Sequence, residues 1–361
     1  MIFTVEKKNL QMGLNAVKNG LNKKDLASIF ATNIQVIAKG DSLSFVTTNG
    51  ETHYAWKSSV GVSIEQEGSI AVNADKLLSA LPHLPEDKVS FSLNSNLLNV
   101  KSGKIVMELK TISDKSFGKV SEIETPISLK GETSTAMFRR IIHTLNRDPA
   151  KPRMLGLLLD FKSDGDKKTV VFKSVSPTRA SRYNTEFESA EPINAQVVMP
   201  CYLVDEAAKH NLIKLGFNKA NMVAVFDNNL TVTSPLQENV FINPDQVFDA
   251  NDTWQDIKFN REDLGKAISF IKSMSDKQDK KARIAATGDG AVEISSYTDS
   301  GKSKIALLAT YGDKPNFAFN SEHLAELLTA LDDGDVELKV GGNLLTYATP
   351  NYKFVTSLSK L

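Results

Sequence analysis

The stretch SPTRASRYNTEF, residues 176–187, gathers side chains that could do chemistry. Its first eight positions hold four hydroxyl groups and two arginines, and it lies between runs typical of β-strands. Arginines can bind phosphate, and hydroxyls can be nucleophiles or phosphorylation sites. The sequence offers these hydroxyls no base or metal partner, and the arginines have no glycine-rich nest. The stretch is therefore a phosphate site, a modification site or one wall of a protein-binding surface.

Other motifs with catalytic spacing are equally isolated. The five histidines are scattered singly, and no pair has the i, i+4 spacing of a helical zinc site. The tripeptide at 301–303 imitates the end of a phosphate loop, but Ser296 stands where that loop needs its first glycine. The single cysteine, Cys201, excludes a disulfide framework and any multi-thiolate metal site. We therefore expect no enzyme, with no catalytic residues, no metal and no cofactor.

A clearer charge pattern follows the outer faces of three expected helices. Each helix places basic or amide side chains opposite its apolar stripe, which is the arrangement that could line a path for a phosphate backbone. Such contacts position a duplex without reading its bases. The alternative is an ordinary solvated helix face. The candidate DNA-facing residues are Lys8, Lys18, Arg139, His143, Arg147 and Lys266.

Composition limits this nucleic-acid interpretation without excluding it. The chain has 43 basic and 43 acidic residues, so bulk attraction to a polyanion is absent and any DNA role depends on uneven placement of charge. No apolar run approaches the roughly 18 residues of a membrane span. The start of the sequence, MIFTVEKKNL, has no signal-peptide apolar region, so we expect a cytoplasmic protein without membrane partners.

Weak self-similarity organises the whole chain. Residues 69–100, 195–232 and 316–347 each predict a strand, a capped helix and two strands joined by a turn of Asn, Asp, Ser or Gly residues. A strand followed by an amphipathic helix precedes each of these segments. The pattern predicts three tandem α+β units, residues 1–122, 123–248 and 249–361, each with two strand-helix-strands modules.

The order and spacing of several segments resemble the bacterial sliding clamp, the beta subunit of DNA polymerase III. MIFTVEKKNLQMGLNAVKNGL is similar to the family's first strand and helix, and SIAVNADKLLSALPHLPEDKVSFSL to the segment that closes its first domain. KPRMLGLLLDF, VVMPCYLVDEAAK and FAFNSEHLAELLTAL resemble later segments in the same order. SPTRASRYNTEF stands where the family has a threonine-aspartate-glycine-histidine-arginine-leucine motif. The resemblance covers the whole chain.

The resemblance implies a head-to-tail homodimer that closes a ring around duplex DNA, with helices lining the hole and sheets outside. Such a ring tethers a DNA polymerase, and a clamp loader and other clamp-binding-motif proteins are its further partners. A topological link does not require tight binding, so a net charge of zero is tolerable. The resemblance also implies which residues form the dimer interface: Leu78, Leu81, Lys104, Val106, Phe270, Met274, Lys304 and Ala306.

The family has one docking pocket in which partners insert short apolar peptides. Burial of a few apolar anchors, at about 25 cal/mol per Å², would drive that binding. Position by position, the resemblance assigns the pocket to Met154, Leu155, Thr178, Ala180, Ser181, Arg182, Tyr183, Pro244, Val247, Phe248, Val355, Leu358 and Leu361.

Departures from the family pattern fall within this pocket. Ala180 and Ser181 replace the motif glycine and histidine, and the C-terminal SLSKL retains only a basic residue and the last leucine. We hypothesise a divergent clamp, encoded by a phage or other mobile element, whose partners carry a variant motif. Two other functions compete with it: a structural or assembly ring that is not loaded on DNA, and a hydrolase or transferase, for which no catalytic set can be assembled.

Overall fold

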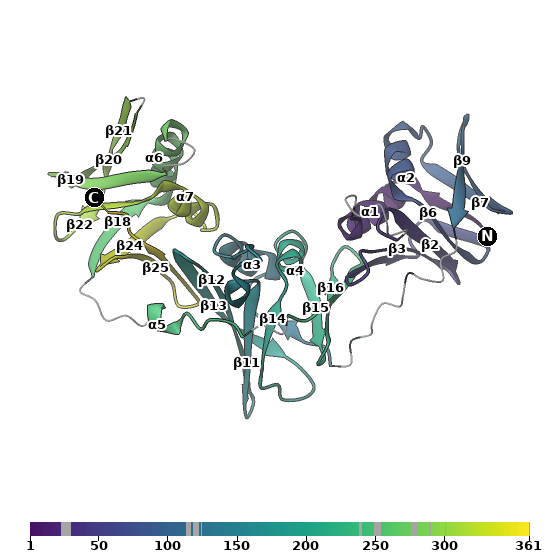
Figure 1. Cartoon of the computed structure of the whole chain (residues 1–361), viewed down its shortest axis with the longest axis horizontal. Coiled ribbons are helices and arrows are strands. Elements are labelled where there is room, and N and C mark those ends of the chain that lie inside the picture. Colours follow the sequence, from purple (N-terminus) through teal and green to yellow (C-terminus); the bar gives the residue numbers. More distant parts are fainter. Residues whose placement is uncertain are drawn as a thin grey trace. The chain divides into compact units, whose positions relative to one another are not determined.

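A computed structural model describes residues 1–22, 30–112, 117, 123, 125–237, 240–248, 254–275, 280–288, 290–299 and 301–360 (Figure 1). The chain forms two compact units. The first comprises Met1–Ser128 and His210–Leu236, and the second Leu129–Lys209 and Gln237–Leu361. Both units are α+β, as predicted.

The first unit is built on a sheet of twelve strands in the order β15-β16-β17-β4-β3-β2-β6-β9-β8-β7-β1-β5. Two helices, α1 (Lys7–Val17) and α2 (Ala74–Ala80), and two short 3-10 turns, η1 (Lys18–Gly20) and η2 (Leu81–His83), accompany it. The strands are β1 (Ile2–Glu6), β2 (Asn33–Lys39), β3 (Ser42–Thr48), β4 (His53–Ser58), β5 (Val62–Gln66), β6 (Gly68–Asn73), β7 (Lys88–Asn94), β8 (Leu97–Ser102), β9 (Ile105–Ile112), β15 (Leu212–Phe217), β16 (Asn221–Phe226) and β17 (Leu230–Pro235).

Helix α1 packs on this sheet through its predicted apolar stripe. Leu10, Leu14 and Val17 are fully buried, as period-3.6 spacing requires of a core-facing stripe. Gly13 allows the close approach, because a Cβ there would lie 2.5 Å from the Trp56 ring. A small residue at that point therefore sets the distance between helix and sheet.

The second unit has a sheet of ten strands, with β14-β11-β12-β13-β26-β25-β24-β18-β22 in order and β10 beside β13, and a smaller sheet β21-β20-β19-β23. Its helices are α3 (Ser134–Ile142), α4 (Cys201–Ala207), α5 (Asp245–Phe248), α6 (Arg261–Met274) and α7 (Ser321–Thr329), with the 3-10 turn η3 (Pro152–Met154). The strands are β10 (Ser128–Leu129), β11 (Leu157–Asp164), β12 (Lys167–Ser176), β13 (Arg179–Glu188), β14 (Ala195–Met199), β18 (Gln255–Asn260), β19 (Lys281–Gly288), β20 (Ala291–Thr298), β21 (Gly301–Leu308), β22 (Thr310–Tyr311), β23 (Asn316–Asn320), β24 (Asp335–Gly341), β25 (Leu344–Ala348) and β26 (Tyr352–Ser357).

Strand pairing runs across the predicted repeat boundaries. In the first unit β17 pairs with β4, and in the second β13 pairs with β26. Strands of the middle repeat therefore join both sheets, and the two compact units do not follow the three predicted repeats. Positions 122 and 249, where the boundaries were placed, lie outside the described residues. The three-domain division stays a prediction.

The turns expected in the three repeats have the predicted chemistry. Ser95, Asn229 and Gly342 each adopt a positive φ, of 53°, 64° and 53°. Residues of these types tolerate the left-handed region that tight hairpins need. The Asn-, Ser- and Gly-rich turns therefore set the hairpin register in each repeat.

One predicted helix is shorter than expected. The helical spacing of Phe138, Ile141 and Leu145 favours a helix over residues 134–147, but α3 ends at Ile142. Thr144 directs its hydroxyl to the carbonyl of Ile141 and to the hydroxyls of Ser174 and Ser181. Such side-chain bonding competes with the helical backbone, so Arg147 lies beyond the helix.

Candidate partner-binding and DNA-facing sites

An apolar cluster lies beside α5 on the large sheet of the second unit. Four of its side chains are buried: Val175, Ala180, Phe248 and Val355. Three half-buried side chains, Met154, Phe241 and Leu344, pack against them. We call these seven residues the α5 cluster. Its combination of buried and half-buried apolar groups is suited to receive an apolar anchor.

Strand register explains how the α5 cluster forms. Val175, Ala180 and Val355 lie opposite one another on β12, β13 and β26. Directly opposed residues share a sheet face, so these three side chains form one row. Phe248 reaches the row from α5.

Four of the predicted pocket residues thus come together: Met154, Ala180, Phe248 and Val355. The sequence analysis missed Val175, Phe241 and Leu344. Val175 could have been found from the two-residue loop between β12 and β13, which sets it opposite Ala180. Phe241 and Leu344 carry no comparable local signal, because packing between distant segments brings them in.

Ser181 and Tyr183, predicted for the same wall, lie on the other face of β13. The Ser181 hydroxyl is 2.6 Å from Thr144 Oγ1 and 2.9 Å from Ser174 Oγ, in a fully buried group of three hydroxyls. Tyr183 is buried between the rings of Phe172 and Tyr352. Alternation along a strand causes this separation, because residues one apart face opposite sides.

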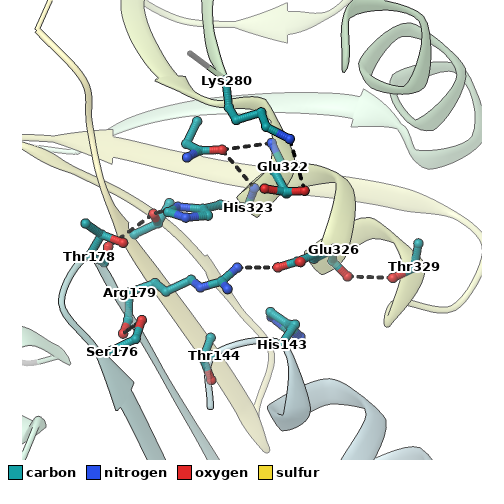
Figure 2. Close-up of polar contacts among 12 residues, drawn as sticks. His143, Thr144, Ser176, Thr178, Arg179, Lys280, Glu322, His323, Glu326 and Thr329 are labelled. Carbon is teal, nitrogen blue, oxygen red and sulfur yellow. Dashed lines mark hydrogen bonds and ion pairs between the residues drawn. The ribbon is translucent and has the colours of Figure 1, made fainter. Parts of the chain in front are cut away.

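The turn at Thr178 is fixed to β26 and α7 (Figure 2). The Thr178 carbonyl accepts hydrogen bonds from the Ser357 amide, at 2.8 Å, and from the Thr356 hydroxyl, at 3.3 Å. Arg179 forms an ion pair with Glu326 of α7. His323 Nδ1 lies 2.9 Å from Thr356 Oγ1, and burial together with the Arg179 charge lowers the pKa of His323 to about 4. Arg179 therefore links the turn at Thr178 to helix α7.

The remaining predicted pocket residues have mixed positions. The Arg182 guanidinium lies 5.1 Å from the centre of the Phe248 ring. Pro244 is buried, Leu155 is half-buried, and Val247 is 41% exposed. Leu358 and Phe317 line a cavity of about 600 Å³. Leu361 lies outside the described residues.

The candidate DNA-facing cations of the second unit have partners. Arg147 makes two bonds of 2.6 and 2.8 Å to the Asp205 carboxylate, and Lys266 pairs with Glu262 at 2.6 Å. Arg139 Nε donates to the Ala208 carbonyl at 3.0 Å. The two carboxylates offset the positive charge of Arg147 and Lys266, whereas the Ala208 carbonyl is neutral and leaves the charge of Arg139 in place.

His143 differs from the expected exposed cation. Its ring packs 5.4 Å from the Phe354 ring, and Nε2 lies 3.3 Å from the Tyr352 hydroxyl. Burial, and then the Arg179 charge, lower the pKa of His143 to about 3. The imidazole is therefore neutral near pH 7 and adds no positive charge to the surface.

In the first unit, Lys8 and Lys18 are exposed. Lys18 Nζ lies 3.5 Å from the Asn15 amide oxygen. Within the described part of the chain, neither lysine is recorded in an ion pair. Both ammonium groups are therefore candidates for contact with a phosphate backbone.

Two strand edges carry three of the eight predicted interface residues, Val106, Lys304 and Ala306. Residues 105–110 of β9 pair with β8 on one side, and β9 meets β6 only at its last two residues. Strand β21 is the last of its sheet. Across the described ranges, neither edge pairs with a further strand, and each presents unpaired backbone groups.

The interface side chains differ in exposure. Val106, Phe270 and Met274 are 61%, 42% and 55% exposed, which is unusual for large apolar groups. Lys104, Lys304 and Ala306 are also exposed, and Lys304 pairs with Glu293 at 3.1 Å. Leu78 is half-buried, whereas Leu81 belongs to the core at 5% exposure.

Two further properties bear on function. Among the residues that the structure describes, no group of three or more His, Cys, Asp or Glu side chains could hold a metal ion. No described helix has the length and apolarity needed to cross a membrane.

Comparisons with known proteins agree on one family. The profile of the DNA polymerase III beta subunit N-terminal domain matches residues 1–121. The beta sliding clamp of Treponema pallidum (strain Nichols) is 24% identical over 204 residues, which are 55% of this chain. The match spans 53%, about half, of that relative's length.

Solved structures share the fold over the full chain. The DNA polymerase sliding clamp of Bacillus subtilis has a TM-score of 0.87 at 18% identity, covering 100% of this chain and 99% of the other. The Helicobacter pylori beta clamp bound to a DNA ligase peptide has a TM-score of 0.84 at 15% identity, covering 100% of both chains. At identities of 18% and 15%, these matches establish the fold alone.

Proposed function

We propose that this chain, in which residues 1–121 belong to the DNA polymerase III beta subunit family and the whole length has the bacterial sliding-clamp fold, is a processivity factor that encircles duplex DNA. The observation that carries the proposal is the fold match over the complete chain. The clamp tethers a polymerase and acts without catalysing a reaction. Its site of action is the cytoplasm.

A head-to-tail dimer explains the two open strand edges. Residues 105–110 of one protomer would pair with β21 of the other and continue both sheets across the interface. Val106 beside β21 and the exposed Phe270 and Met274 on α6 would then be buried. Each chain supplies both edges, so two copies close a ring of six repeats.

The partner site is the α5 cluster. A peptide anchor would pack among Met154, Phe248 and Val355, and the exposed Val247 would contact it at the edge. The Helicobacter pylori clamp bound to a DNA ligase peptide supports this class of partner. A clamp loader and a polymerase are the partners that we propose here. Ala180 fills the wall where the family has glycine, so the peptide motif should differ.

Retention on DNA tests the ring. The protein is loaded onto nicked circular DNA with a clamp loader, and half of the sample is then linearised. We expect the clamp to remain on circles and to slide off cut ends. Equal loss from both forms would refute encirclement and would favour an assembly ring that is not loaded on DNA.

Peptide titration tests the altered motif. We expect the DNA ligase peptide to bind more weakly here than to a bacterial clamp measured in parallel, because Ala180 narrows the wall. Full affinity for that peptide would contradict a divergent partner specificity. Light scattering at several concentrations supplies the oligomeric state that both experiments assume.

A further inference from the structure

Three cations from neighbouring strands meet helix α5. Lys173 of β12, Arg182 of β13 and Lys353 of β26 lie opposite one another, two residues along from the apolar row of the α5 cluster. Strand alternation therefore puts all three on the same sheet face as that cluster. We call them the cation row.

Each member of the cation row contacts a different part of α5. Lys173 Nζ lies 2.8 Å from Asp245 Oδ2, at the start of the helix. The Arg182 guanidinium stacks on the Phe248 ring, and Lys353 Nζ donates a hydrogen bond to the Phe248 carbonyl at the helix end. Both ends and one side chain of α5 are thus attached to the sheet.

These attachments matter because α5 has only four residues. So short a helix is unstable by itself, since the first turn is costly to form. Its position must come from contacts outside the helix. The amides of Val247 and Phe248 donate hydrogen bonds to the carbonyl of Pro244, which precedes α5, at 3.0 and 3.4 Å.

Lys173 has two carboxylate partners with different environments. It lies 3.4 Å from Asp160, and the side chains of both residues are almost fully buried. Asp245 is about one-third exposed. A buried charge is strongly destabilising when it loses its only partner. Because Asp160 remains, removal of Asp245 does not leave Lys173 unpaired, and the role of Asp245 can be tested without unfolding the sheet.

The pKa of Asp245 is consistent with this contact. Burial alone would raise it, but hydrogen bonds from Lys173 and Asn243 outweigh burial and lower the pKa below its usual value. Asp245 is therefore ionised at neutral pH and attracts the Lys173 ammonium throughout the physiological range.

We propose that the cation row docks α5 on the sheet and that Asp245 and Lys173 are positioning residues for partner binding. They hold Phe248 inside the α5 cluster and Val247 at its exposed edge, without contacting the partner themselves. The role in partner binding rests on the proposed function. The docking of α5 on the sheet rests on the contacts of α5 alone.

The test replaces Asp245 in the full-length protein and measures two quantities. Asp245→Ala removes a charge-assisted hydrogen bond, so the Kd of a fluorescein-labelled DNA ligase peptide should rise about tenfold. Amide hydrogen exchange of residues 240–248 should accelerate, while exchange elsewhere in the second unit and the Tm stay near wild type. Lys353→Met should give the same pattern more weakly.

Asp335→Ala is the matched control, because Asp335 forms a comparable 2.9 Å ion pair with Lys258 away from α5. It should change neither quantity. Unchanged exchange at 240–248 in Asp245→Ala would overturn the proposal, and so would faster exchange with a peptide Kd within twofold of wild type. If the wild-type protein does not bind the DNA ligase peptide, that result bears on the proposed function alone, and hydrogen exchange at residues 240–248 decides whether the cation row docks α5.

Discussion

Helices α1 and α6 occupy equivalent places in the predicted repeats but differ in how their cations are paired. Each follows the first strand of its repeat and buries an apolar stripe. On α1 and its end, Lys8 and Lys18 are exposed and, among the described residues, have no recorded ion pair. On α6, Lys266 pairs with Glu262, and Lys272 lies 3.5 Å from Glu322.

The difference shows that a basic stripe in a sequence does not fix the charge presented by a surface. Glu262 belongs to α6 itself, but Glu322 comes from α7, about 50 residues later in the chain. When a carboxylate lies within hydrogen-bonding distance of a lysine, it offsets the electrostatic attraction between that lysine and a nearby phosphate. We therefore expect α1 to contribute more to DNA binding than α6.

The largest effect should follow from removing Lys8 of α1 and Lys18 of η1, for which the described residues provide no carboxylate partner. Each lysine that contacts a phosphate contributes about 0.9 to the slope of log K against log salt. The Lys8→Gln, Lys18→Gln double variant should lower that slope by about 1.8, measured by fluorescence anisotropy on linear duplex DNA over a range of KCl concentrations. Lys57→Gln, an exposed lysine on β4, is the control. A slope equal to wild type would show that α1 does not face DNA.

A smaller effect is expected on α6, where the charges compensate one another. Glu262→Gln alone releases Lys266 and should raise the slope by at most about 0.9. Glu262→Gln combined with Lys266→Gln removes no net charge and should leave the slope unchanged. If the salt dependence of DNA binding falls as much in the Glu262→Gln, Lys266→Gln variant as in the Lys8→Gln, Lys18→Gln variant, then α1 does not contribute more to DNA binding than α6.

Local patterns in the sequence predicted most of the fold. The apolar stripes of α1 and α6 and the three positive-φ turns depend on neighbouring residues alone, and they are confirmed, except that Met274, expected in the α6 stripe, is 55% exposed. The end of α3 was wrong by five residues, because the hydroxyl contacts of Thr144 involve strands distant in sequence. The helical periodicity of a sequence does not reveal contacts with distant strands that compete with the helix.

The candidate site was less predictable for the same reason. Resemblance to a family placed Ala180 and Ser181 on one wall, yet successive residues of a strand face opposite sides. Ala180 enters the α5 cluster and Ser181 joins the buried hydroxyls. Arg182 was expected on the same wall, but its stacking on Phe248 depends on helix α5. The sequence alone gives no register for that contact.

The smallest expected effect concerns His143, which was predicted to face DNA. Its folded pKa of about 3 lies below the ordinary value of 6.5, so it stays neutral at pH 6 and above. His143→Gln should therefore leave the salt slope unchanged at both pH 8 and pH 6. A slope that falls in this variant at pH 6 but not at pH 8 would mean that a charged imidazole faces the duplex.

The same pKa has a consequence for stability with a defined sign. Between about pH 3 and pH 6.5 the unfolded chain binds the proton that folded His143 excludes, so this residue makes the free energy of unfolding fall as pH decreases. His143→Gln removes that contribution. Urea unfolding at pH 7 and pH 5 should then show a loss on acidification that is smaller than in wild type by about 2 kcal/mol. An equal loss in both proteins would mean that the imidazole is exposed to water. His143 would then again be a candidate DNA-facing cation.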